Sequence, residues 1–100
     1  MPKSFGVKEY TALRPVQDHV SNGSVSTAVS IAVPESATLL LIQAISKNVR
    51  VTLDASTTAT ATVGFQVTAG TAQYFPVGAT TSVSVIEESA SATIQYQFFE

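Results

Sequence analysis

Hydrophobic and polar residues alternate along most of the chain after position 24, in segments short enough to be single strands. The first segment, "SVSTAVSIAV", has mainly valine or isoleucine on one parity and serine or alanine on the other. Because the side chains of a strand point alternately to two faces, this period-2 pattern predicts half-buried β-strands. The pattern recurs later, and the predicted apolar faces are Val49, Val51 and Leu53; Val63, Phe65 and Val67; Val83 and Val85; and Ile94, Tyr96 and Phe98.

One further segment, "TLLLIQAIS" at 38–46, is apolar without interruption and predicts a centrally placed strand. Turn signals separate the segments, among them "SNGS" at 21–24, Pro34, Gly70 and Gly78. No window shows a sustained helical period. The sequence therefore predicts an all-β fold, namely a compact antiparallel β-sandwich or small barrel of six to eight short strands.

Residues 1–20 differ from the rest of the chain. They hold Lys3, Lys8, Glu9, Arg14 and Asp18, and their apolar residues are irregularly spaced. We expect an extended N-terminal arm over 1–20, with one short strand near 10–13, followed by a sandwich domain over 21–100. The alternative interpretation of the first segment is a frayed terminus.

Charge is scarce in this chain. Only 12% of the residues are Asp, Glu, Lys or Arg, against about 25% in ordinary globular domains. Asp54 is the single charged residue between positions 51 and 86. Such depletion is typical of a surface that meets another protein surface. The formal net charge of −2 gives no reason to expect a nucleic-acid or membrane partner.

The chain has no cysteine, no apolar run long enough to span a bilayer and no apolar core of a signal peptide near its first residue. We therefore expect a protein made in the cytoplasm.

Candidate catalytic residues are few. Asp18 and His19 could belong to a serine-histidine-aspartate arrangement, but no serine lies in a nucleophile motif and a solvated histidine is the simpler interpretation. Glu87 and Glu88 are adjacent, so a strand would point them to opposite faces. There is no phosphate loop and no metal-ligand spacing. We expect no enzyme activity, no cofactor and no metal.

Asp54, followed by Thr57 and Thr58, could either close a turn or bind a cation through oxygen ligands. We favour the turn, in which the aspartate side chain accepts hydrogen bonds from backbone N–H groups.

A motif in the second half of the chain carries a resemblance to a known family. It consists of Asn48, Val49, Arg50, Thr52, Leu53, Asp54, Thr60, Thr62, Gly64 and Phe65. The stretch from Ala44 to Glu100 resembles small tailed-bacteriophage virion structural proteins, in which this segment forms a β-hairpin or β-arch. Ala55 and Ala59 stand where the family pattern has glycine and proline, and residues 1–43 show no such resemblance.

The resemblance implies a virion protein, assembled in the host cytoplasm, that decorates or cements the capsid, or else a neck or tail accessory protein. It gives Asp54 and Gly64 a structural role at the bend. We expect the chain to bind the major capsid protein and to form a homotrimer. Expected capsid contacts are Phe5, Tyr10, Leu13 and Arg14, and expected contacts between subunits are Tyr74, Phe75 and Phe99.

A carbohydrate-binding module displayed on a particle is a further alternative. It would use Tyr74 and Phe75 as a stacking pair beside the charge-poor loop 55–62.

Overall fold

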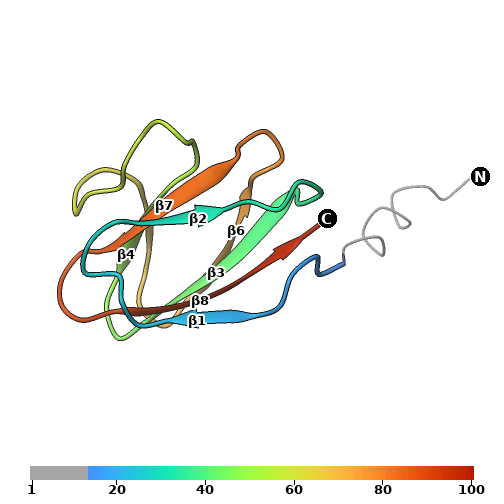
Figure 1. Cartoon of the computed structure of the whole chain (residues 1–100). Helices are drawn as coiled ribbons and strands as arrows, with labels where there is room; N and C mark the ends of the chain where they lie inside the picture. The colour runs from blue at the N-terminus through green and yellow to red at the C-terminus, as the bar shows by residue number, and fades with distance from the viewer. Residues whose placement is uncertain (1–13) are drawn as a thin grey trace, which may run out of the picture.

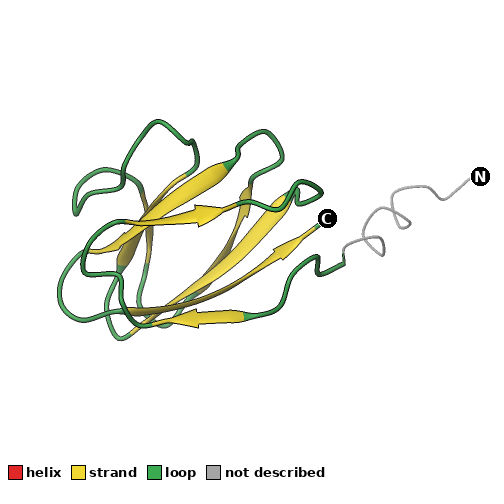
Figure 2. Cartoon of the chain, viewed as in Figure 1, coloured by secondary structure: helices red, strands yellow, loops and turns green. Residues whose placement is uncertain are grey.

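The computed structural model describes residues 14–100, which form eight strands in two antiparallel sheets and contain no helix (Figures 1 and 2). The all-β sandwich predicted from the sequence is confirmed. Sheet A has the strand order β1-β8-β3-β6, and sheet B has the order β2-β7-β4-β5. The strands are β1 (Val20–Asn22), β2 (Val29–Ala32), β3 (Leu39–Ile45), β4 (Val49–Thr52), β5 (Phe65–Val67), β6 (Ala72–Pro76), β7 (Ser82–Glu87) and β8 (Thr93–Phe99).

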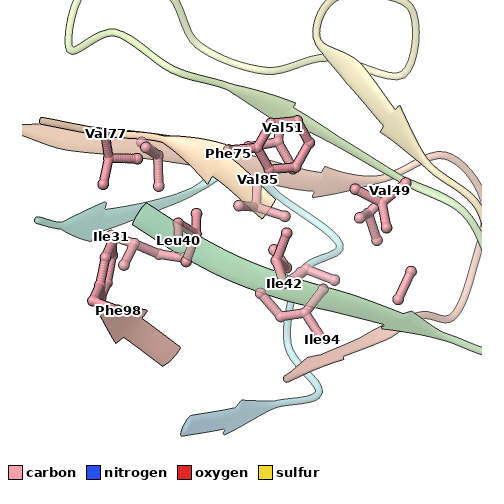
Figure 3. Packing of buried hydrophobic residues seen from close by; sticks show 14 of the residues in the cluster. Ile31, Leu40, Ile42, Val49, Val51, Phe75, Val77, Val85, Ile94 and Phe98 are labelled. Atoms are coloured by element: carbon pink, nitrogen blue, oxygen red, sulfur yellow. The ribbon is translucent and has the colours of Figure 1, made fainter. Parts of the chain in front are cut away.

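Every connection except the one between β4 and β5 crosses from one sheet to the other. Each sheet therefore turns one face toward the other, and the alternate apolar residues of both sheets meet in a single core (Figure 3). Its fully buried members include Leu40, Ile42, Ile94 and Phe98 from sheet A, and Val49, Val51, Val67, Val83 and Val85 from sheet B.

The predicted central strand lies at the centre of sheet A. β3 pairs with β8 on one side and with β6 on the other, and every second residue of β3 is buried. The inward face of β8 is also as predicted, because Ile94 and Phe98 are fully buried and Tyr96 packs against the core. Burial raises the pKa of the Tyr96 hydroxyl.

The start of the sandwich differs from the prediction. Val20–Asn22, expected at the end of the arm and in a turn, is a strand paired with β8. The chain lies beside β8 from Val16 onward, because the Val16 N–H donates to the Phe98 carbonyl at 3.0 Å. These three residues, two of them polar, form a strand because β8 supplies the partner, which local sequence does not reveal. The next predicted strand, 24–33, is shorter than expected and spans only Val29–Ala32.

The apolar face predicted at 63–67 is only partly buried. Val67 is fully buried, whereas Val63 is 44% exposed and Phe65 is 60% exposed. Phe65 lies opposite Val51 in the sheet register and so shares its inward face. Since β5 is the edge of sheet B, the Phe65 ring reaches only the rim of the core, where its centroid lies 6.1 Å from that of Phe75.

Candidate interaction surface

The outer face of sheet A turns away from the core. The sheet register places on it the residues that alternate with the buried ones, namely Ser21, Leu39, Leu41, Gln43, Ile45, Ala72, Tyr74, Pro76, Thr93, Gln95, Gln97 and Phe99. Each of these residues lies in the described part of the chain, and none of them is charged. The face is therefore one continuous uncharged surface of apolar, amide and hydroxyl side chains.

β3 explains why this surface is apolar. Leu39, Leu41 and Ile45 point to the outer face and are all partly exposed, while the residues between them are buried. A sheet face that meets water normally carries polar side chains on its outward positions. Apolar side chains at outward positions are a feature of surfaces that contact other proteins, so this face is a candidate interaction site.

Two of the three residues expected between subunits meet on this face. Tyr74 is 57% exposed, and its ring lies edge-on to the ring of Phe99 with centroids 6.3 Å apart. Phe75 points the opposite way, because it follows Tyr74 in the same strand, and it is only 7% exposed in the core. Phe75 is thus a core residue of its own chain, and it does not form a stacking pair with Tyr74.

One of the expected capsid contacts lies at the end of the same sheet. Arg14 pairs with Glu100 at 2.8 Å, and the guanidinium side chain is 71% exposed. The two residues also exchange backbone hydrogen bonds, so the chain enters the sandwich beside the end of β8. Phe5, Tyr10 and Leu13 lie outside the described residues.

The outer face of sheet B is different, because the chain itself covers part of it. The loop that joins β4 to β5, residues 53–64, lies next to β7 (Figure 1) and is called the covering loop below. The Ala59 N–H donates to the Ser84 hydroxyl at 3.0 Å, and the Thr52 hydroxyl donates to the Thr57 carbonyl at 2.6 Å. Ala59 is 1% exposed, while the loop residues on either side of it are exposed.

The two residues expected at the bend lie at the two ends of the covering loop. Asp54 accepts hydrogen bonds from the N–H and the hydroxyl of Thr57, at 3.0 and 3.2 Å, which is the geometry of a turn closed by an aspartate. Gly64 has a φ of 131°, and a Cβ at this position would lie 3.0 Å from the backbone nitrogen of Val51. Gly64 therefore lets the returning chain pass close to β4.

Arg50 fixes the end of the loop through a polar network on sheet B. Its guanidinium donates to the Gly64 carbonyl at 3.0 Å and to Glu88. Hydrogen bonds from Gln66 and from Arg50 hold the pKa of Glu88 below its usual value. Glu87 instead accepts from the Ala92 N–H at 3.0 Å, so the two adjacent carboxylates serve separate turns.

The remaining candidates for chemistry are dispersed. His19 lies 3.1 Å from the side-chain oxygen of Gln95 at the border of the outer face of sheet A. Within residues 14–100 there is no group of three His, Cys, Asp or Glu side chains placed to hold a metal ion. The same range contains no helix that is long and apolar enough to cross a membrane.

An open depression at one end of the sandwich has a volume of about 410 Å³ and is lined by Leu53, Asp54, Ala55, Pro76, Val77, Ala79, Thr80 and Thr81. The one titratable side chain among these lining residues is Asp54, which already closes the turn. The depression therefore offers no set of converging polar groups, and the outer face of sheet A remains the best candidate site.

Sequence reasoning did not identify Leu39 and Leu41 as part of this surface. The available signal was the apolar run on both parities of β3, which means that both faces of the strand are apolar. Comparison of the chain with protein-family models, with curated proteins and with solved structures gives no match.

Proposed function

We propose that this chain is a structural protein of a bacteriophage particle, which binds the capsid surface as an oligomer and stabilises the shell. The observation that carries the proposal is the uncharged outer face of sheet A, where Tyr74, Phe99, Leu39 and Leu41 lie together. Such a face functions by being buried against another protein, and repetition around a symmetric shell multiplies the gain from each contact.

The bacteriophage setting rests on the resemblance of the segment that begins at Asn48. In the structure its residues organise the covering loop: Arg50 binds the Gly64 carbonyl, and Asp54 closes the turn at Thr57. Asn48 accepts from the Ala69 N–H at 2.8 Å and so fixes the following turn as well. This use as a folding motif fits a family of structural proteins better than a family that shares a ligand site.

A neck or tail accessory protein is the second candidate, because the same uncharged face would serve a ring of few copies equally well.

The structure does not favour the carbohydrate-binding alternative, because the two aromatic rings expected to stack on a sugar are not on one face. Tyr74 and Phe75 point to opposite sides of sheet A, and the loop 55–62 lies over sheet B.

The test is the copy number of this chain relative to the major capsid protein in purified particles of the phage that encodes it. Hundreds of copies would support decoration of the shell. About a dozen would move the protein to the neck or tail. Its absence from particles would overturn the proposal.

A matched pair of variants tests the surface itself. Leu41→Lys places a charge in the outer face of sheet A, and Thr58→Lys places the same charge on the exposed part of the covering loop. Leu41→Lys is expected to lose binding to particles that lack the protein, whereas Thr58→Lys should bind like the natural chain. Equal binding by the two variants would show that the outer face of sheet A is not the contact.

A further inference from the structure

β6 is an edge strand with one free side. It pairs with β3, and no described strand lies beyond it. Three backbone hydrogen bonds show which residues turn toward β3: Ala44 N–H to Thr71 O (3.2 Å), Gly70 N–H to Ala44 O (2.8 Å) and Val77 N–H to Thr38 O (2.9 Å). Because backbone groups alternate along a strand, those of Ala72, Tyr74 and Pro76 point away from the sheet.

This edge lacks the features that normally prevent strands from pairing. Edge strands are usually guarded by lysine, by an inward charge, by a bulge or by a cover. β6 reads Ala-Gln-Tyr-Phe-Pro, has no charge, and is exposed at every position except Phe75. The one guard is Pro76, which removes a donor at the last position and leaves the Tyr74 N–H and carbonyl free to pair.

We propose that β6 pairs with β6 of a second copy of this chain, in antiparallel direction, about a two-fold axis at Tyr74. The strand is complementary to itself in this register. Each Tyr74 would donate to and accept from the Tyr74 of the other copy, and each Ala72 N–H would face the Pro76 carbonyl. Pro76 supplies only its carbonyl, so each of these outer pairs forms one hydrogen bond and leaves the Ala72 carbonyl without a donor. With both strands uncharged, no repulsion opposes the contact.

Edge pairing also enlarges the uncharged surface that the protein presents. The strands of sheet A have three, seven, seven and five residues and together cover about 350 Å² on one face. Edge pairing joins the two faces into one surface of about 700 Å², which a third protein such as a capsid subunit would cover.

Use of this joined surface against a shell rests on the function proposed above, whereas the pairing itself does not. The pairing also specifies a two-fold contact, which differs from the homotrimer expected from the sequence.

The first experiment measures the purified full chain by sedimentation equilibrium and by amide hydrogen exchange across a concentration series. A dimer is expected, with the Tyr74 amide becoming protected as the dimer forms, since that N–H has no partner within its own sheet. A protein that stays monomeric at millimolar concentration, a trimer, or a dimer with a freely exchanging Tyr74 amide would each overturn the proposal.

Three variants separate backbone pairing from side-chain contact. Tyr74→Pro removes the outward N–H together with the ring, Tyr74→Ser removes only the ring, and Ser30→Pro removes an outward N–H from β2, the edge of the other sheet. Tyr74→Pro should weaken association at least about tenfold relative to Tyr74→Ser, because the central pair of hydrogen bonds is lost. Ser30→Pro should dimerise normally. Equal weakening by Tyr74→Pro and Tyr74→Ser would contradict edge pairing.

Far-ultraviolet circular dichroism of each variant controls for folding. If Tyr74→Pro does not fold, Gln73→Lys replaces it, since Gln73 is exposed and a lysine there guards the edge. A monomeric chain present in hundreds of copies per particle would overturn the pairing alone. A dimer that is absent from particles would overturn the proposed function alone.

Discussion

Replacement of Gly64 by alanine tests the account of the covering loop most directly. Gly64 has a φ of 131°, which residues with a Cβ rarely adopt, and the added Cβ would lie 3.0 Å from Val51 N, 3.1 Å from Val51 O and 3.1 Å from Arg50 Cβ. The strained backbone alone costs about 1 to 3 kcal/mol. Because two of the close atoms belong to the backbone of β4 and cannot rotate away, we expect a total loss of about 3 kcal/mol.

Two other glycines provide controls of graded severity. Gly70 has a φ of 84° but nothing within 4 Å of an added Cβ, so Gly70→Ala should lose only the strain, about 1 kcal/mol. Gly78 has no positive φ, and its nearest neighbour is 3.9 Å away. Gly78→Ala should be neutral or stabilising by about 0.5 kcal/mol, because alanine restricts the unfolded chain.

The assay is equilibrium unfolding in urea, followed by far-ultraviolet circular dichroism and by the fluorescence of the three tyrosines, since the chain has no tryptophan. For a domain of this size, the loss at Gly64 corresponds to roughly 10 to 20 °C in Tm. Gly78→Ala should be the most stable of the three variants, Gly70→Ala should be less stable, and Gly64→Ala should be the least stable. If Gly64→Ala and Gly70→Ala were equally stable, the close approach of residue 64 to Val51 would have no energetic consequence, and Gly64 would not be required by that contact.

Three further predictions concern the same side of the molecule. Asp54→Ala should destabilise the chain by about 1 kcal/mol, because the backbone N–H of Thr57 loses its acceptor, and urea unfolding measures the loss. Ala59→Glu should detach the covering loop from sheet B, because Ala59 is buried, whereas Ala61→Glu, at an exposed position, should not. Limited proteolysis with mass spectrometry should show new cuts within 53–64 only in Ala59→Glu. The pKa of Glu88 is lowered in the folded chain, so its ionised form contributes stability above the ordinary glutamate pKa of about 4.3. The natural chain should therefore be more stable than Glu88→Gln by a constant amount near neutral pH, and this difference should disappear as the pH falls through the lowered pKa of Glu88. Urea unfolding at several pH values measures the difference. A difference that does not vary with pH would contradict this assignment.

The strands that the sequence predicts best are those whose alternation is maintained by a core on one side. In β8, Ile94 and Phe98 repeat with period 2 and both are fully buried. β1 could not be predicted in this way, because its three residues form a strand only through pairing with β8. Phe65 shows a second limit: alternation gives the face of a residue, but the position of β5 at the sheet edge determines that its ring is exposed.

The candidate surface was predictable in part. Tyr74 and Phe99 are aromatic residues that the core cannot absorb, and both lie on the outer face of sheet A. Parity alone shows that Tyr74 and Phe75 point to opposite faces of a strand, so they could not both lie on the outer face. Nothing in the sequence separates Ala59 from the other alanines of the covering loop, so its burial against Ser84 depends on tertiary packing.

The scarcity of charge concerns two different surfaces of this molecule. At the covering loop the chain folds back on sheet B and buries Ala59 of the loop together with Thr52 of β4 and Ser84 of β7. The absence of charge at these three residues is explained within a single chain and gives no evidence of a partner. On the outer face of sheet A, Tyr74 is 57% exposed and Leu41 is partly exposed. The inference of a binding partner therefore rests on sheet A alone, and a variant that adds charge there, but not one that adds charge to the exposed part of the covering loop, is the change that should abolish assembly.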